Sequence, residues 1–387
     1  MNTTPSTSTS TSTSTSTFNG VPIQVPLEII TEEEMAFLEA ALSSALPLFP
    51  PRCSSPSSLF RVAAIASLPS SPKSQSQPLR SPDIEDSTPP APVGSLLHRF
   101  RSRRALAVTD ITGSEWCEKQ VEFGLLHGRP KRTAAMEAGS IRHAELEEEV
   151  VEKVEIQIKS IEESWALKFM NFMVGANQLL FEGLTRELPV IGVVEDTWMI
   201  GVIDELQMPV GESSLNPCLV DTKTRYRATI PSEAQKRNAR LQLMCYKYLW
   251  DNLVVNDFPT GHFFDHFALN PQYVLSEDIR QYSSSLGFEA KTFEEVVSYF
   301  RNTCSMLPPS DEQLLLRYEL QSDHSILEEY KFSFDANWFK NEIQKRLEFW
   351  RGEREAEYVS DAERWKCRFC KFSASCPVTL ASSNKAE

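Results

Sequence analysis

The sequence predicts an α/β domain in which helices flank a mixed central sheet, over residues 101–380 of the 387. Runs rich in β-branched and apolar residues predict three strands, at 186–194, 197–206 and 217–224. The first two flank the polar pair Glu195-Asp196, which is typical of a hairpin turn. Pro231 and Ser232 then open a long helical stretch that reaches residue 254. Helix, hairpin, strand and helix in this order indicate a sheet covered by helices.

The other elements of the domain are marked by weaker patterns. Helical periodicity with few breakers runs through 133–182, and eight glutamates between 145 and 163 suit the solvated face of a helix. Residues 258–330 indicate a less regular α+β region, in which Phe263, Phe264 and Phe267 suit a core strand. A further helix is expected at 335–358, just before a cluster of cysteines.

Residues 1–100 have the composition of a disordered region. Residues 1–17 are a Ser/Thr repeat and 47–98 are rich in Ser and Pro, so neither segment can bury a core. Between them, 31–46 predicts one short amphipathic helix with a capping box. The hydroxyl-rich leader suits a transit peptide for chloroplast or mitochondrion, whereas its acidic cluster does not, which leaves the nucleus open. Residues 381–387 are expected to form a tail.

Bulk composition excludes several classes of protein. A net charge of −14 argues against a general nucleic-acid coat protein. No apolar run approaches the roughly 18 residues that cross a bilayer, so we expect no membrane span. Eight cysteines are too sparse for a secreted disulfide scaffold. Basic residues nevertheless gather locally, at Arg225 and Arg227, at Lys236, Arg237 and Arg240, and at Arg364, Lys366, Arg368 and Lys371.

Two predicted strands end in acidic residues. Asp204 lies near the end of the strand at 197–206, and Asp221 lies two residues before Lys223 in the next strand, so the latter pair shares a face. If these strands are neighbours, the two carboxylates converge into an oxygen site suited to Mg²⁺ or Mn²⁺. A lysine beside them can orient water and offset charge on a phosphate, which suits phosphodiester hydrolysis. A solvated edge pair is the ordinary alternative.

Two helical stretches add polar residues of catalytic type. His143 follows Gly139 and Ser140 upstream of the strands, although a lone histidine is more often a packed or surface residue. Gln242 and Tyr246 are four residues apart and share one face of the long helix. Local hydrogen bonding would explain this pair equally well, so the residues alone assign it no role.

Four short motifs occur in an order that resembles the RecB-type branch of the PD-(D/E)XK nuclease superfamily. They are GSIRH at 139–143, GVID at 201–204, DTK at 221–223 and QLMCY at 242–246. The layout of 104–378 is similar to that of the exonuclease V family, which acts on single-stranded DNA. The chain departs from many RecB-type members in carrying Asp221 instead of glutamate, a shorter arm that shifts the geometry of the site.

The resemblance implies a PD-(D/E)XK core and six catalytic residues drawn from the four motifs: His143, Asp204, Asp221, Lys223, Gln242 and Tyr246. The two aspartates would bind the catalytic Mg²⁺ or Mn²⁺, with the histidine as a further ligand. The lysine would assist the attacking water, and the glutamine and tyrosine would position the substrate or the lysine. Glu187 stands where relatives often carry a glutamate.

The C-terminal run ERWKCRFCKFSASCP has the spacing C-x2-C-x5-C, and a thiolate site needs four ligands. The resemblance implies that the fourth lies upstream, where we expect it at the start of a helix. The full set would be Cys117, Cys367, Cys370 and Cys376. Spacing permits Zn²⁺ or a [4Fe–4S] cluster, but the 250 positions between the first two disfavour a zinc ribbon. We therefore expect an iron–sulfur cluster that joins the two ends of the domain.

These observations predict a metal-dependent exonuclease that hydrolyses single-stranded DNA in repair or genome maintenance. We expect a monomer, with a single-strand-binding, replication or repair protein as its candidate partner. Two alternatives stay open, namely a DNA-binding scaffold of nuclease fold that has lost its chemistry, and a zinc-stabilised interaction domain. The polarity of digestion and the preference for DNA over RNA also stay open.

Overall fold

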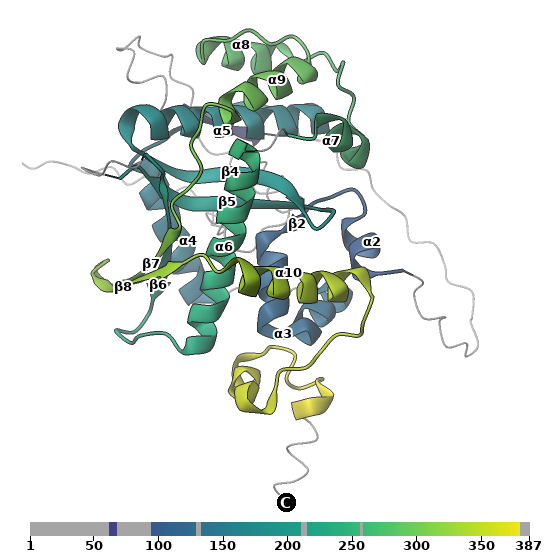
Figure 1. Cartoon of the computed structure of the whole chain (residues 1–387), viewed down its shortest axis with the longest axis vertical. Helices are drawn as coiled ribbons and strands as arrows, with labels where there is room; N and C mark the ends of the chain where they lie inside the picture. Colours follow the sequence, from purple (N-terminus) through teal and green to yellow (C-terminus); the bar gives the residue numbers. More distant parts are fainter. Residues whose placement is uncertain (1–61, 68–93, 129–132, 210–214, 256–257, 380–387) are drawn as a thin grey trace, which may run out of the picture.

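The computed structural model describes residues 62–67, 94–128, 133–209, 215–255 and 258–379 (Figure 1). The helices are α2 (Leu96–Arg101), α3 (Val108–His127), α4 (Ala134–Glu148), α5 (Ile161–Glu182), α6 (Glu233–Val255), α7 (Thr260–Phe267), α8 (Glu277–Ser285), α9 (Phe293–Cys304) and α10 (Ala336–Arg351), followed by a 3-10 helix at Asp361–Phe369. The strands are β1 (Val62–Ser67), β2 (Leu106–Ala107), β3 (Glu152–Gln157), β4 (Leu184–Val194), β5 (Thr197–Gln207), β6 (Cys218–Arg225), β7 (Gln313–Leu320) and β8 (Ile326–Ser333).

A mixed sheet of six strands forms the centre of the domain, which confirms the predicted α/β class. Its order is β2-β5-β6-β7-β8, and β4 pairs with β5 as an antiparallel hairpin that is interrupted only at Glu187 and Asp204. β6 and β7 run parallel, whereas β5 with β6 and β7 with β8 are antiparallel. β1 and β3 form a separate parallel pair.

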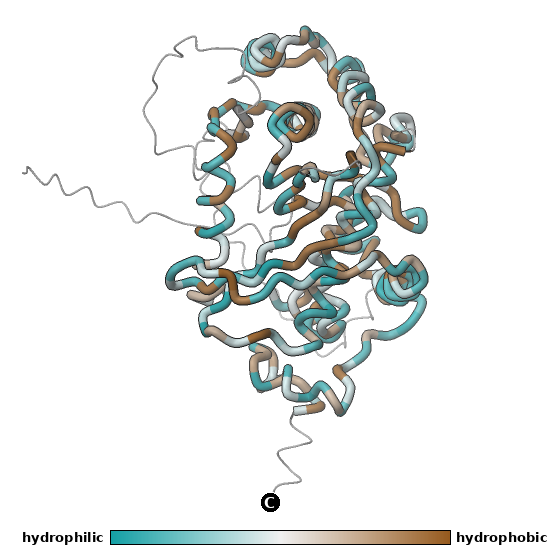
Figure 2. Tube along the Cα trace, turned by 60° about the vertical axis from the view of Figure 1, so that its left-hand side comes forward, coloured by the Kyte–Doolittle hydropathy of each residue, from teal (hydrophilic) through white to brown (hydrophobic). Residues whose placement is uncertain are grey.

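Helices flank the sheet and bury its apolar side chains. In Figure 1, α6 crosses in front of the strands, and α5 lies between them and the layer of α8 and α9. Figure 2 shows hydrophobic residues concentrated in the central strands and in α5. α5 is apolar around most of its circumference, as expected for a helix buried on several sides, and includes Trp165, Phe169 and Phe172 at 1–2% exposure. Among the described residues, no helix combines the length and hydrophobicity needed to cross a bilayer.

The prediction of continuous helix over 133–182 was wrong in its middle. β3 separates α4 from α5, because Val154, Ile156 and Ile158 alternate with polar residues at the period of a strand. The solvated glutamate face was wrong at its end as well. Glu163 is fully buried and accepts the backbone N–H groups of Lys159 and Ser276, at 2.6 and 2.8 Å.

Two further segments differ from their predictions. Phe263, Phe264 and Phe267 do lie in the core, but on helix α7, where positions i and i+4 share a face. β1 lies within the stretch predicted as linker, and Asn171 of α5 binds both backbone groups of its Ala64 at 2.8 Å. The helix predicted at 31–46 lies outside the described residues, so the transit peptide and the compartment stay predictions.

Close packing of α5 on β4 depends on Gly175, which gives a test of the fold. A Cβ at this position would lie 2.4 Å from Leu188 Cδ1 and 2.9 Å from Thr185 Oγ1, and both neighbours are buried. We expect Gly175→Ala to lower the Tm by roughly 3–8 °C, because overpacking a rigid core is destabilising. Gly124→Ala on α3, where no atom lies within 4 Å, is the control and should leave the Tm unchanged or slightly raised. Equal Tm values for the two variants would contradict this packing.

Candidate active site

The middle of β5 lacks a strand partner along one edge. β4 occupies the other edge throughout, while this edge pairs with β2 at Met199 and Ile200 and with β6 from Glu205 onward. Between them, Gly201–Asp204 pairs on this edge with none of the described strands. We call this interruption the ladder gap, and it coincides with the GVID motif. Backbone groups beside it need other partners, since buried polar groups are costly when unsatisfied.

Side chains of the predicted site supply those partners. The N–H of Thr222 on β6 donates to Asp204 Oδ2 at 3.2 Å. The carbonyl of the same Thr222 lies 3.0 Å from Nε2 of His143. Both backbone groups of one buried β6 residue are thus satisfied by a carboxylate and an imidazole. The ladder gap is closed by functional groups rather than by a third strand pairing.

Strand register brings three carboxylates to one level of the sheet. The β4–β5 register is interrupted at Glu187 and Asp204, and the pairs on either side of the interruption place these two residues opposite one another. The β5–β6 register, continued by one residue, places Asp204 opposite Asp221. Residues opposite one another in antiparallel strands have Cβ atoms about 4.5–5.5 Å apart. Glu187 interrupts the ladder with a φ of 48°, a left-handed conformation that costs about 1–3 kcal/mol and is typical of functional positions.

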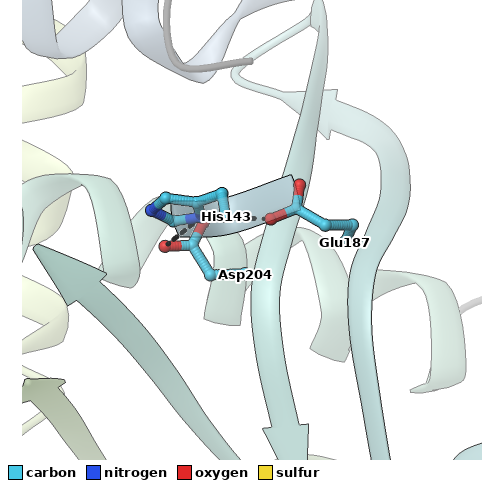
Figure 3. Close-up of side chains that lie close together, drawn as sticks. All are labelled: His143, Glu187 and Asp204. Atoms are coloured by element: carbon cyan, nitrogen blue, oxygen red, sulfur yellow. Dashed lines mark hydrogen bonds and ion pairs between the residues drawn. The ribbon is translucent and has the colours of Figure 1, made fainter. Parts of the chain in front are cut away.

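His143 reaches these carboxylates from α4. Its Nδ1 lies 3.1 Å from Glu187 Oε1 and 3.8 Å from Asp204 Oδ2 (Figure 3). One ligand atom from each of the three residues lies within 4.8 Å of the others. α4 can approach β6 closely because its Gly139 carries no Cβ, which would lie 3.1 Å from the Thr224 hydroxyl. The glycine of the GSIRH motif therefore helps to position its histidine.

Hydrogen bonding fixes the orientation of the His143 ring. A carbonyl only accepts, so Nε2 carries the proton that it shares with Thr222. In the neutral ring the lone pair then lies on Nδ1, which faces the two carboxylates. Burial raises the pKa of Glu187, although the hydrogen bond and charge of His143 act in the opposite direction. One of these two side chains must hold the proton in their 3.1 Å contact, and that is the place a metal ion would take.

Asp221 and Lys223 form a buried pair rather than a solvated one. Asp221 is fully buried, and the Lys223 Nζ lies 3.1 Å from its Oδ1. The Lys223 side chain is one-fifth exposed, so it can contact both the buried carboxylate and a molecule arriving from solvent. Desolvation of a carboxylate at this depth is costly, and the lysine offsets part of the cost.

α6 closes the ladder gap with Gln242 and Tyr246. Gln242 Nε2 donates to the Tyr246 hydroxyl at 3.0 Å. Gly201 lets the ring lie against β5, because a Cβ there would fall 2.5 Å from Tyr246 Cε1. Burial raises the pKa of Tyr246 well above its ordinary value, and the charge of Asp204 raises it further. Tyr246 is therefore a neutral phenol beside the carboxylates.

The structure gathers the six sequence-derived residues around the ladder gap and adds a seventh. Tyr246 lies within electrostatic range of Asp204, Asp221 and Lys223, so β5, β6 and α6 contribute to one site. Glu187 had been given no role from the sequence. The signal was available in the hairpin, because counting back from the Glu195-Asp196 turn places Glu187 opposite Asp204.

We call the part of α3 around Cys117 and residues 361–379 the cysteine segments. In Figure 1 the second of them lies below α3, which carries the first. Cys117 lies within α3, but its extended backbone (φ −168°, ψ 110°) divides α3 into two helices, so it stands at the start of the second one, as predicted. Trp116 packs edge-on against Trp365 at 5.7 Å between ring centroids, and Phe123 lies 5.8 Å from Phe372. The two ends of the domain are therefore in contact, as the resemblance implied, whereas the cluster itself stays a prediction.

The thiols lie close enough to influence one another. Burial is the largest influence on the Cys117 thiol and raises its pKa, the backbone N–H of Gln120 lowers it, and the thiols of Cys370 and Cys367 raise it. Among the described residues, no three of the cysteine sulfurs lie within 4.8 Å of one another. Thiolates bound 2.3 Å from one tetrahedral zinc would be about 3.8 Å apart.

Ion pairs connect both cysteine segments to the rest of the domain. Glu118, beside Cys117, is 1% exposed and accepts two hydrogen bonds from Arg354 at 2.6 Å. Arg237 of α6 donates to Glu115 at 2.6 Å and to Glu363 at 2.9 Å. Since α6 also carries Gln242 and Tyr246, one helix contacts both the cysteine segments and the ladder gap.

Comparison with known proteins identifies the family to which this site belongs. Residues 95–217, 212–305 and 281–377 match the family model described as "Exonuclease V - a 5' deoxyribonuclease". The chain is also 33% identical to exonuclease V of Danio rerio over 289 residues, which cover 73% of this chain and 72% of the relative. The chain belongs to the exonuclease V family.

Membership of the exonuclease V family confirms the predicted class of enzyme, a deoxyribonuclease. It also supplies the 5′ polarity that the sequence left open. The segments matched to exonuclease V together span the ladder gap, α6 and the four cysteines, so both sites lie inside the shared region.

The buried charge of Glu187 gives a test of the site geometry. In metal-free protein at pH 7.5, we expect Glu187→Gln to raise the Tm by roughly 2–6 °C, because the amide keeps the shape and removes a buried charge. A carboxyl whose pKa is raised by folding lowers stability once the pH exceeds its unfolded value. The difference should therefore be absent near pH 4, where both states are protonated, and grow toward neutral pH.

Glu329→Gln is the matched control, because Glu329 is an exposed strand residue paired with Arg317 at the far side of the sheet. Its Tm should stay within about 1 °C of the wild type. A wild type that is more stable than Glu187→Gln in metal-free buffer at pH 7.5 would show that the Glu187 charge stabilises the fold, contrary to this account.

Proposed function

We propose that this member of the exonuclease V family is a metal-dependent 5′ exonuclease of single-stranded DNA, acting in repair or genome maintenance on a PD-(D/E)XK core. The observation that carries the proposal is the row of Glu187, Asp204 and Asp221 at the ladder gap. His143 and Lys223 lie against two members of that row. Such a group of oxygen ligands with one cation suits phosphodiester hydrolysis. The monomeric state and a repair or single-strand-binding partner stay predictions.

The residues around the ladder gap fit Mg²⁺ or Mn²⁺. Ligand atoms about 2.1 Å from an octahedral ion lie about 3.0 Å apart when adjacent and about 4.2 Å apart when opposite. The 3.1 and 3.8 Å contacts of His143 fall in this range. Carboxylates suit both ions, and an imidazole favours Mn²⁺ somewhat. A bound ion would supply an acidified water and a polarised phosphate.

The chain's own groups do the remaining work. Lys223 can orient the attacking water and offset the charge that builds on the phosphate, because its ammonium lies 3.1 Å from Asp221 and its side chain is partly exposed. Tyr246 is held by Gln242, and its raised pKa keeps the phenol protonated to high pH, so it stays a neutral hydrogen-bond donor. His143 keeps its Nδ1 lone pair directed at the carboxylates through the Thr222 carbonyl.

The cysteines are proposed to hold a [4Fe–4S] cluster. Trp116 packs on Trp365 and Phe123 on Phe372 beside the cysteines, where these rings would limit access of water to a cluster. Backbone N–H groups of Gln120 and Val359 lie against the Cys117 sulfur, and such hydrogen bonds tune cluster thiolates. The cluster would act as a staple between the two ends of the domain. The ligands would be Cys117, Cys367, Cys370 and Cys376.

Replacing Asp221 tests the chemistry. We expect Asp221→Asn to lower Mg²⁺-dependent degradation of a 5′-labelled single-stranded oligonucleotide by about 10²–10³-fold, because the site loses a charged ligand and Lys223 loses its counter-charge. The measurement is single-turnover degradation with Mg²⁺ or Mn²⁺ varied, beside a duplex of the same sequence. DNA binding without metal, measured by fluorescence anisotropy, should change only a few-fold.

Glu329→Gln serves again as the control and should degrade DNA at the wild-type rate. Unchanged degradation by Asp221→Asn would show that the site is misplaced. Equal rates of degradation of the single strand and the duplex would contradict the proposed preference for single-stranded DNA. A wild type that binds DNA and degrades none with either ion would favour the scaffold alternative.

Loss of the cluster tests the cysteine assignment. We expect Cys117→Ala to lose bound iron and visible absorbance as completely as Cys367→Ala, although 250 positions separate them, because a four-thiolate cluster needs both ends of the domain. Elemental analysis of anaerobically purified protein is the measurement. Cys218→Ala, a half-buried cysteine at the start of β6, should retain iron. Iron retained by Cys117→Ala, or zinc in place of iron in the wild type, would refute the assignment.

A further inference from the structure

The chain leaves the active-site strand through an exposed aromatic residue between two arginines. β6 carries Asp221 and Lys223, ends at Arg225, and continues into Tyr226 and Arg227. The Tyr226 side chain is 77% exposed, although tyrosine usually buries much of its ring. Within the described residues, its ring packs against no other aromatic ring, and Arg227 forms no ion pair. An exposed ring and a solvated cation therefore stand side by side just past the catalytic lysine.

The backbone that carries this ring is braced, in spite of the exposure. The Arg225 carbonyl accepts from the Gln321 N–H at 2.9 Å, which ties the end of β6 to the β7–β8 turn. The Arg225 guanidinium donates to the Thr229 carbonyl at 3.3 Å, and the Thr229 N–H donates to the Arg227 carbonyl at 2.7 Å. These contacts hold the turn from both sides. The ring is thus presented to solvent on a fixed support, which lowers the entropy lost when it binds a ligand.

Position distinguishes Tyr226 from the other exposed aromatic residues. Three aromatic side chains among the described residues are more than 70% exposed, namely Tyr226, Phe181 and Phe369. Phe181 lies near the end of α5 next to Glu182, and Phe369 lies in the cysteine segment. Tyr226 alone continues the catalytic strand. Tyr226 lies in the bend that follows β6, three residues after Lys223, so the two Cα atoms are at most about 10 Å apart, a reach of one or two nucleotides.

We propose that Tyr226 is a stacking platform for a base of single-stranded DNA next to the scissile phosphate, with Arg227 contacting the adjacent backbone. The inference rests on the proposed function and names the group that gives it strand specificity. An aromatic face accepts any unstacked base, and a neighbouring arginine offsets phosphate charge. A base within a duplex is already stacked and paired on both sides, so it cannot be offered to the ring. The platform therefore favours single strands without reading sequence.

Binding without catalysis is the first measurement. With the iron-replete full chain in metal-free buffer, we expect Tyr226→Ala to weaken binding of a fluorescent 20-nucleotide oligothymidine about tenfold, within the roughly 5- to 150-fold that stacking of one base gives. Tyr226→Phe should bind like the wild type, because it keeps the ring. Tyr226→Leu should resemble Tyr226→Ala, because apolar bulk does not replace an aromatic face. Phe181→Ala, which removes a ring of similar exposure, is the control and should bind like the wild type.

An abasic scan identifies the stacked base. One nucleotide at a time is replaced by an abasic residue near the 5′ end, and binding is measured for wild type and Tyr226→Ala. We expect one position at which the wild type falls to the level of the variant and the variant falls no further. The platform would be overturned if Tyr226→Ala bound like Phe181→Ala, or if Tyr226→Leu bound like Tyr226→Phe. It would also be overturned if no abasic position brought the affinity of the wild type down to that of Tyr226→Ala.

The outcome for the platform is separable from the outcome for the proposed chemistry. A wild type that degrades single-stranded DNA with Mg²⁺, together with unchanged binding by Tyr226→Ala, leaves the chemistry standing and removes the platform. A wild type that degrades no DNA with either ion, together with weakened binding and a converging abasic scan, removes the chemistry and leaves the platform standing.

Discussion

The interrupted edge of β5 at Gly201–Asp204 is the constraint on which the active site depends. A central strand normally satisfies its neighbours' backbone groups, and an interruption inside a sheet must be compensated. Here Asp204 and His143 bind the N–H and carbonyl of Thr222, so the side chains that could hold a metal also complete the hydrogen bonding of the sheet. The fold thereby fixes their positions before any ligand arrives, which is the preorganisation that catalysis requires. Glycines at 139 and 201 permit α4 and Tyr246 to come close enough to fill the interruption.

α6 links this site to the cysteine segments. Its first turns bind Glu115 and Glu363 through Arg237, and its middle carries the Gln242–Tyr246 pair. Buried or half-buried ion pairs of this kind add little net stability, but breaking one leaves a charge without its partner. The contacts assemble the two cysteine segments through protein groups alone. A cluster would therefore reinforce an arrangement that the ion pairs already set. Its loss would destabilise the C-terminal segment first and then α6, which contacts that segment through Arg237.

Much of this arrangement was predictable from the sequence, and the misses have physical causes. β-branched runs and a polar turn predicted the hairpin and β6, because such residues are typical of half-buried strands. β3 was missed because its glutamates fit a helical pattern as well as a strand, and pairing with the distant β1 decided between them. Glu187 was left without a role because register, not composition, brings it opposite Asp204. The Phe-rich α7 was predicted as strand, since aromatic residues favour strands where helical spacing is overlooked.

The charge balance of the ladder gap explains why so strained an arrangement would persist. Glu187, Asp204 and Asp221 bring three negative charges to one level of the sheet, and Lys223 returns one positive charge. With a neutral His143, the net charge of these groups is −2, which one divalent cation would neutralise. Burial of Glu187 and its positive φ both act against the metal-free fold. Evolution tolerates such costs where a ligand relieves them, so the least stable feature of the sheet is also the one best matched to Mg²⁺ or Mn²⁺.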